Sequence, residues 1–274
     1  MRSTQRPFVW FYFMGTFAWS WFFWGLILLG WGQALKPVWM ALGGLGPALA
    51  GMVFTYQEGG REALRDYGRR LVEVRRIPAW VWGAAVLIMP VILLMAGQID
   101  LFFGGQGVQL DARDFAFTKG LPLVLAIPAA ILFFWVVGPL PEEMGWRGYA
   151  LDRLQQKMGP MRASVVLALF WVGWHIPLTL MSGAFGEAFS PGSTGFWLLV
   201  VDFISVSILM TWLYNQSNRS ILIAVLFHFD CNMTLETIHH DNLLEAIRIA
   251  LGLVVVAVVI KKDWFLGYPF PKSS

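Results

Sequence analysis

The chain of 274 residues is 57% hydrophobic and 14% charged, and it carries 15 tryptophans and 22 phenylalanines. This composition excludes an ordinary soluble domain, in which about 25% of the residues are charged. The formal net charge is +3, and no basic face with interleaved aromatic residues predicts nucleic-acid binding. Cys231 is the single cysteine, so the sequence predicts neither a disulfide nor a thiolate metal site.

Long apolar segments follow one another along the sequence. Each is close to the ~20 residues that cross ~30 Å of hydrocarbon as a helix. We therefore predict an all-α fold, a polytopic membrane helical bundle of about eight transmembrane helices that forms a single domain over residues 1–274. The predicted spans are 8–30, 38–56, 79–98, 121–140, 164–181, 196–214, 221–238 and 247–260.

Basic residues gather in alternate loops, which predicts the orientation of the chain in the membrane. If the N-terminus is cytoplasmic, sixteen of the 20 lysines and arginines lie on the cytoplasmic side. The positive-inside rule then places both termini in the cytoplasm, and the Trp-rich, short-looped chain is typical of a bacterial inner membrane protein. The loop 57–78 has two interpretations: a simple charge cluster, or an amphipathic helix that lies on anionic headgroups through Arg65, Arg69, Arg70 and Arg76.

Glu142 and Glu143 are the most informative polar residues, because a carboxylate at membrane depth costs ~2.5–3.5 kcal/mol on insertion scales. Pro139 and Pro141 precede them, so we predict that the fourth span is broken there and that a new helical segment begins. On that helix Glu143 and Arg147 lie four residues apart and can form an ion pair, which leaves Glu142 on a different face.

Two histidines lie inside later spans, on the same predicted side of the membrane as the glutamates. His175 belongs to the fifth span and His228 to the seventh, and Asn232 follows His228 by about one helical turn. A partly desolvated carboxylate that takes a proton from water, with imidazole and amide donors for an oxyanion, is able to hydrolyse a peptide bond. Glu142, His175 and His228 also form a donor set that suits Zn²⁺, so metal-dependent and metal-free hydrolysis are both open.

Other interpretations apply to the same polar residues. A lone intramembrane histidine often makes a hydrogen bond between helices, and the set of glutamates and histidines also suits a transporter that relays protons. A non-catalytic, immunity-type protein that binds a partner is a third interpretation. Asp230 is predicted to orient one of the histidines, Asp202 to make a structural contact, and His239 and His240 to lie in a solvated loop.

The polar residues resemble the three motifs of the CPBP family of intramembrane proteases, which includes the CAAX prenyl protease type 2 and Abi proteins. The first motif, Glu-Glu-x-x-x-Arg, is matched by residues 142–147. The second, an aromatic residue four positions before a histidine, is matched by Trp171 and His175, and the third, His-x-x-x-Asn, by residues 228–232. The resemblance covers residues 121–240, which we take as the motif-bearing core.

The resemblance implies an eight-helix protease with a cavity open to the cytoplasm and the membrane. Its pattern implies that Glu142 and His175 activate water and that His228 and Asn232 hold the oxyanion, with the Glu-Arg pair of the first motif in support. Family members are described both as metalloproteases and as metal-free glutamate enzymes, so the implied cofactor is either none or Zn²⁺. The expected partners are a hydrophobic or membrane-associated peptide and the lipid bilayer.

Overall fold

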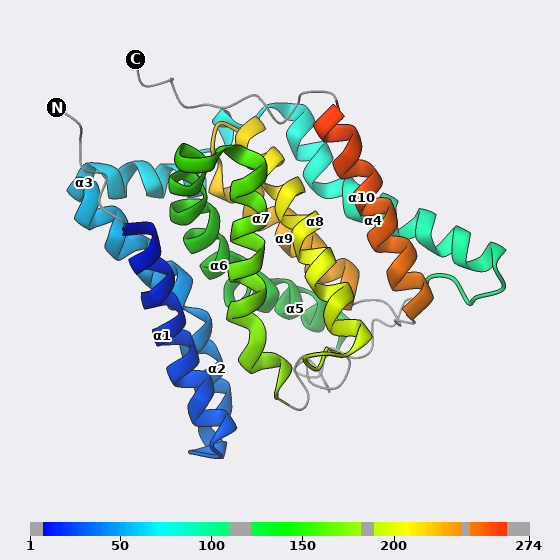
Figure 1. Ribbon diagram of the computed structural model, residues 1–274, viewed down its shortest axis with the longest axis horizontal. Coiled ribbons are helices and arrows are strands. Elements are labelled where there is room, and N and C mark those ends of the chain that lie inside the picture. Colours follow the sequence, from blue (N-terminus) through cyan, green and yellow to red (C-terminus); the bar gives the residue numbers. More distant parts are fainter. Residues whose placement is uncertain (1–7, 110–121, 182–188, 237–241, 262–274) are drawn as a thin grey trace.

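The computed structural model describes residues 8–109, 122–181, 189–236 and 242–261. Within these ranges the regular structure is helical throughout, and the predicted polytopic helical bundle is confirmed (Figure 1). The elements are α1 (Phe8–Leu28), the turn η1 (Gln33–Leu35), α2 (Lys36–Gly44), α3 (Gly46–Val72), the turn η2 (Val74–Arg76), α4 (Ala79–Phe102), α5 (Leu123–Val137), α6 (Pro139–Gly145), the π-helical turn η4 (Trp146–Ala150), α7 (Leu151–Thr179), α8 (Thr194–Gln216), α9 (Ile221–Glu236) and α10 (Asn242–Lys261).

Each predicted span corresponds to an apolar helical stretch. In the described residues, six stretches are long and apolar enough to cross a membrane, and Ile221–Thr234 of α9 forms a shorter apolar helix. The longest of the six, Pro139–Thr179, holds two predicted segments because Gly159 interrupts it with a φ of 75°. The chain turns back there, so α6 and the start of α7 run toward one end of the bundle and the rest of α7 returns (Figure 1).

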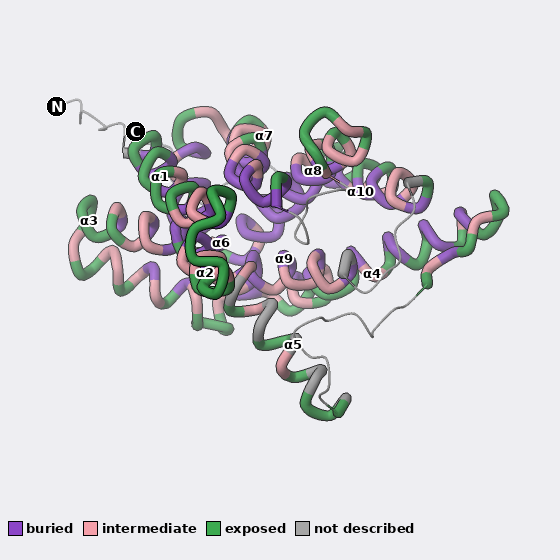
Figure 2. Tube along the Cα trace, turned by 90° about the horizontal axis from the view of Figure 1, so that it is seen from below, coloured by how far each residue is buried: buried purple, intermediate pink, exposed green. Residues whose placement is uncertain are grey.

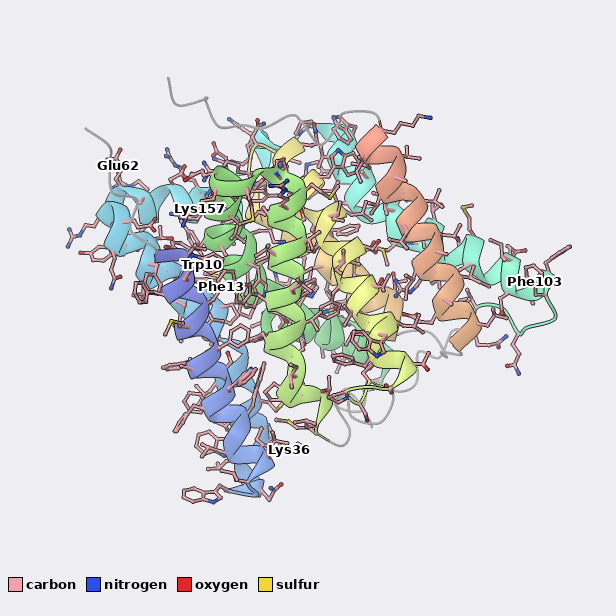
Figure 3. All side chains as sticks on the ribbon, viewed as in Figure 1. Trp10, Phe13, Lys36, Glu62, Phe103 and Lys157 are labelled. Carbon is pink, nitrogen blue, oxygen red and sulfur yellow. The ribbon has the colours of Figure 1, made fainter. Side chains whose placement is uncertain are left out.

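The start of α1 and the end of α10 lie at the same end of the bundle, as expected for an even number of crossings (Figure 1). Glu62 and Lys157 project near this end, whereas Lys36 lies at the opposite end (Figure 3). Which of these ends faces the cytoplasm stays a prediction from the basic-residue pattern. Arg2, Arg6, Lys262, Lys272, the segment 110–121 and the two histidines predicted to lie in a solvated loop are outside the described residues.

The basic segment 57–78 is largely helical, because α3 continues past a kink at Gly59 and Gly60. Its Arg65 and Arg69 are exposed, as an amphipathic surface helix requires. Arg70, however, is only 3% exposed and contacts the body of the protein. The prediction that Arg70 faces lipid headgroups is therefore wrong, because helix packing turns its side chain inward.

The packed core lies around α7, α8 and α9, where buried positions concentrate in the middle of the bundle (Figure 2). Exposed apolar residues occupy the outer faces of α1, α4 and α5, with Phe102 84% and Val124 75% exposed. Such faces are stable where lipid replaces water as the solvent. α5 projects from the side of the bundle and contacts α6 and α9, the helices that carry the two glutamates and His228 (Figure 2).

Candidate active site

The two glutamates lie on a short helix whose start is determined by proline and glycine. α5 ends at Val137, Gly138 separates the helices, and Pro139 occupies the first turn of α6, so the predicted break is confirmed. Both glutamates are buried. Because consecutive helical residues point about 100° apart, the two carboxylates are directed toward different neighbouring helices.

Glu143 joins the π-helical turn η4 to α9. Its Oε1 accepts a hydrogen bond from Arg147 Nη1 at 2.9 Å, so the predicted ion pair is confirmed. The same oxygen lies 2.9 Å from His228 Nδ1. Arg147 Nη2 also donates to the Ser207 hydroxyl on α8 at 3.3 Å. Since Glu143 and Arg147 are fully buried, the pair orients the His228 ring through a carboxylate that is neutralised locally.

Glu142 is joined to α7 instead. The indole Nε1 of Trp171 donates to Glu142 Oε2 at 2.6 Å. One turn later along α7, His175 Nδ1 lies 2.9 Å from the backbone carbonyl of Trp171, which accepts its proton. A neutral His175 therefore carries its lone pair on Nε2, the nitrogen that acts as a base or ligand. The ring is held between Trp174 and Phe203, whose centroids are 4.8 and 5.2 Å away.

The sequence predicts roles for three further polar residues of α8 and α9, namely Asn232, Asp230 and Asp202. Asn232 is partly buried one turn beyond His228 and makes no hydrogen bond to another described residue. Asp230 does not orient a histidine, so that prediction is wrong: the Nδ1 atoms are held by Glu143 and by a backbone carbonyl. Asp202 makes the predicted structural contact, an ion pair of 3.0 Å with the buried Arg248 of α10.

The proposed zinc donors were tested against the geometry. In the described part of the chain, no group of three or more His, Cys, Asp or Glu side chains is arranged to hold a metal ion. Glu142 already accepts the indole proton on Oε2, and His228 directs Nδ1 to Glu143. These contacts use one oxygen of Glu142 and one nitrogen of His228, so Zn²⁺ at Glu142, His175 and His228 stays a prediction, and the chemistry below is derived from side chains alone.

A second polar network, which the sequence did not indicate, supports the turn that carries Arg147. Arg70 Nη2 donates to the carbonyl of Gly148 at 2.8 Å, and Tyr67 donates to the carbonyl of Met144 at 2.6 Å. Both donors come from one face of α3. π-helical turns often occur at functional sites, and here two side chains of α3 donate to backbone carbonyls at this turn.

The same network is anchored by Asp152, the buried carboxylate that follows η4. It accepts hydrogen bonds from Arg70 at 3.2 Å and from the Tyr214 hydroxyl at 2.9 Å, and it pairs with Arg219. Three donors on one carboxylate satisfy the buried charge. The network therefore fixes α3, η4 and α8 relative to one another at the end of the bundle near the glutamates.

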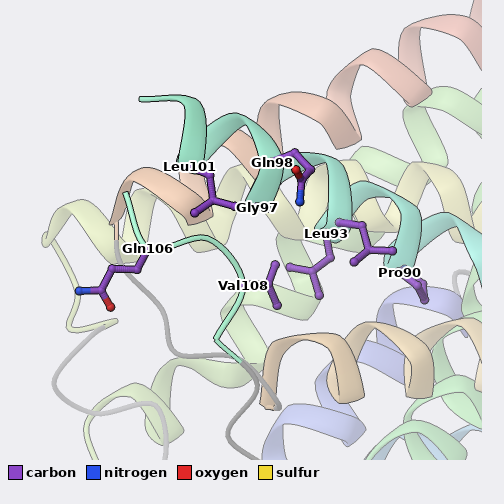
Figure 4. A pocket seen from close by; sticks show the side chains of 8 residues that line it. Pro90, Leu93, Gly97, Gln98, Leu101, Gln106 and Val108 are labelled. Carbon is purple, nitrogen blue, oxygen red and sulfur yellow. The ribbon is translucent and has the colours of Figure 1, made fainter. Parts of the chain in front are cut away.

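Two surface depressions lie away from these residues. One, of roughly 390 Å³, is formed by α4 and the segment that follows it (Figure 4) and is lined by Pro90, Leu93, Leu94, Gly97, Gln98, Leu101, Gln106 and Val108. The other, of roughly 350 Å³, is lined by Arg61, Glu62, Arg65 and Arg69. Neither contains a glutamate or histidine of the candidate site, so we place the chemistry at the buried hydrogen-bonded group.

The comparisons with known proteins agree with the motifs. A family profile described as "Type II CAAX prenyl endopeptidase Rce1-like" matches residues 124–234, which hold both glutamates, both histidines and Asn232. The chain is also 25% identical over 258 residues to a CAAX prenyl protease 2 of Methanococcus maripaludis, with 92% of this chain and 93% of the relative covered. The three motifs, the profile and this relative agree in showing that the chain is similar to the CPBP family of CAAX protease-like intramembrane proteases, and its long apolar helices suit a multi-pass membrane protein.

Proposed function

We propose that this chain is an intramembrane endopeptidase in which Glu142 acts as the general base and His175 orients the water. Glu142 Oε2 is occupied by the Trp171 indole, and no other described residue hydrogen-bonds the carboxylate. Oε1 is therefore the oxygen that takes a proton from water. The resulting hydroxide attacks the peptide carbonyl, and the protonated Glu142 returns the proton to the leaving amine, so that one water is consumed per bond.

His228 and Asn232 are proposed to stabilise the oxyanion of the tetrahedral intermediate. They lie one turn apart on α9, so their side chains share one face. His228 presents Nδ1 to Glu143, which leaves Nε2 for the substrate. Nε2 donates a hydrogen bond when the ring carries both protons, and the Asn232 amide donates in any state. Glu143 and Arg147 then act indirectly, by holding the His228 ring in place.

One observation carries the proposal: adjacent buried glutamates each contact a different histidine-bearing helix. Glu142 is bound to α7 through Trp171, and Glu143 is bound to α9 through His228. A carboxylate and two imidazoles on separate rigid helices provide the acid–base and oxyanion groups that amide hydrolysis needs. If the glutamates had only a structural role, the burial of Glu142 would have no explanation, because its carboxylate makes no ion pair in the described residues.

The relative's name supports a substrate class. The relative is named a CAAX prenyl protease 2, and we propose a membrane-associated or hydrophobic peptide as substrate here. The apolar outer faces of α4 and α5 are compatible with a substrate that approaches from the bilayer. A transporter that relays protons is the alternative, because buried glutamates and histidines serve that purpose as well.

The test is cleavage of a lipidated or hydrophobic peptide library by purified protein in detergent. Glu142→Gln keeps the shape of the side chain and removes the base, so we expect activity to fall by ~10³-fold or more. A chelator is included throughout, and activity that survives it supports the side-chain mechanism. Near-normal turnover by the Glu142→Gln protein, with an unchanged melting temperature, contradicts the assignment of the base and favours the transporter.

A further inference from the structure

Trp171, the aromatic residue of the second motif, contacts three other residues of the candidate site. Its indole Nε1 donates to Glu142, and its own carbonyl accepts the proton of His175 Nδ1. The ring edge also faces the His228 imidazole, with centroids 5.1 Å apart and planes at 78°. One residue of α7 therefore touches the base, its partner histidine and the oxyanion histidine.

The indole is itself held tightly, which is what a positioning group requires. Phe203 of α8 stacks on the ring at 4.4 Å, and the Arg147 guanidinium lies 5.1 Å from the ring centroid. Trp171 is only 3% exposed. Stacking and cation–π contact leave the ring little freedom to rotate, so the direction of its N–H bond is determined before substrate arrives.

We propose that Trp171 is the positioning residue of Glu142, a role that rests on the proposed function of that carboxylate. A carboxylate has two equivalent oxygens and rotates readily about its last bond. The indole engages Oε2 and thereby directs Oε1 toward the water. The backbone carbonyl of the same residue orients His175 Nε2 toward the same space. A phenylalanine at this position would keep the stacking and lose only the first of these interactions.

The experiment compares Trp171→Phe with Trp39→Phe. Trp39 is a matched control, because it packs against the core from α2, away from the candidate site, and its buried Nε1 has no hydrogen-bond partner among the described residues. Both variants lose an indole and leave a smaller ring in its place. Only the first loses a hydrogen bond to Glu142. Comparable changes in melting temperature are therefore expected for the two proteins.

The kinetic constants kcat and KM distinguish the two variants. We expect Trp171→Phe to lower kcat at least about tenfold with KM within about threefold of wild type, since a misdirected catalytic group slows chemistry without weakening binding. Trp39→Phe should keep kcat within about threefold. Equal kcat losses in the two variants, or an unchanged kcat in Trp171→Phe, overturn the positioning role.

A spectroscopic measurement tests the hydrogen bond between Trp171 and Glu142 without measuring activity. In protein labelled with ¹⁵N at the tryptophan indoles, the resonance that disappears in Trp171→Phe identifies Trp171. In Glu142→Ala, which leaves Trp171 unchanged, that resonance should shift more than any other indole signal. This result does not depend on how stably Trp171→Phe folds. An unchanged Trp171 signal refutes the hydrogen bond. If the signal shifts but Glu142→Gln remains active, the proposed function fails and the contact stands.

Discussion

At the scale of single residues, the site depends on one carboxylate oxygen that contacts two side chains. Glu143 Oε1 accepts from Arg147 and faces His228 at the same distance of 2.9 Å. All three residues are at most 4% exposed. A buried ion pair of this kind gives little net stability, yet removal of one partner leaves a charge without compensation. Arg147 is therefore expected to matter for folding as well as for activity.

We predict that Arg147→Met lowers the free energy of unfolding by about 3–5 kcal/mol, because Glu143 remains buried without its cation. The double variant Glu143→Leu, Arg147→Met removes both charges and should recover a large part of that loss. It should stay inactive, since His228 loses the group that orients it. Thermal unfolding in detergent measures the first effect, and peptide cleavage measures the second. A double variant no more stable than Arg147→Met would contradict this account of the pair.

At the scale of the elements, close helix contacts keep the π-helical turn η4 in place. Gly145 packs so tightly that an added Cβ would lie 2.5 Å from the carbonyl oxygen of Pro47 on α3. Gly148 is close to Tyr67, the residue that donates to the Met144 carbonyl. Because backbone cannot move as a side-chain tip can, these two glycines allow α3 to approach α6 and η4.

Gly145→Ala should therefore destabilise the protein by about 1–3 kcal/mol and also reduce turnover, because any shift of α6 moves both glutamates. Gly68→Ala is the matched control, since nothing lies within 4 Å of its added Cβ and it belongs to the interior of α3. There the gain in helix propensity is about 0.8–1.0 kcal/mol. Melting temperatures of the two variants are compared. If both substitutions lower the melting temperature, contact with the α3 backbone is not the reason that Gly145→Ala destabilises the protein.

At the scale of the whole molecule, the proposed orientation places the glutamates near the cytoplasmic half of the bundle. Glu62, three residues before the exposed Arg65 on α3, lies at the end where α1 begins and α10 ends, and Lys36 lies at the other end (Figures 1 and 3). The positive-inside rule assigns the first of these ends to the cytoplasm. Water for hydrolysis would then enter from the cytoplasmic side.

Single cysteines test this orientation in a Cys231→Ala background. With a membrane-impermeant thiol reagent added to intact cells, Lys36→Cys should react and Arg65→Cys should not. After the cells are opened, both should react, because Arg65 is exposed and Lys36 is partly exposed in the fold. The reverse pattern would invert the molecule. It would also place the site on the side opposite to that predicted from the basic residues.

Some properties of this protein follow from the sequence by local physics. Apolar segments of membrane-crossing length predict the helices, since every backbone polar group must be satisfied within lipid. The prolines before Glu142 predict the break between α5 and α6, which the structure confirms. The four-residue spacing of Glu143 and Arg147 predicts their ion pair, because neighbours on a helix are determined by its period.

Other properties were decided only by the tertiary structure. The acceptor for the Trp171 indole lies 29 residues away, and the partner of His228 lies 85 residues away, so no local pattern specifies either contact. Arg70 has the sequence character of a surface arginine, and only the packing of α3 against η4 and α8 buries it. The sequence by itself determined which groups are present in the membrane. The packing of helices determined which of them meet, because side chains distant along the chain come together only when their helices cross.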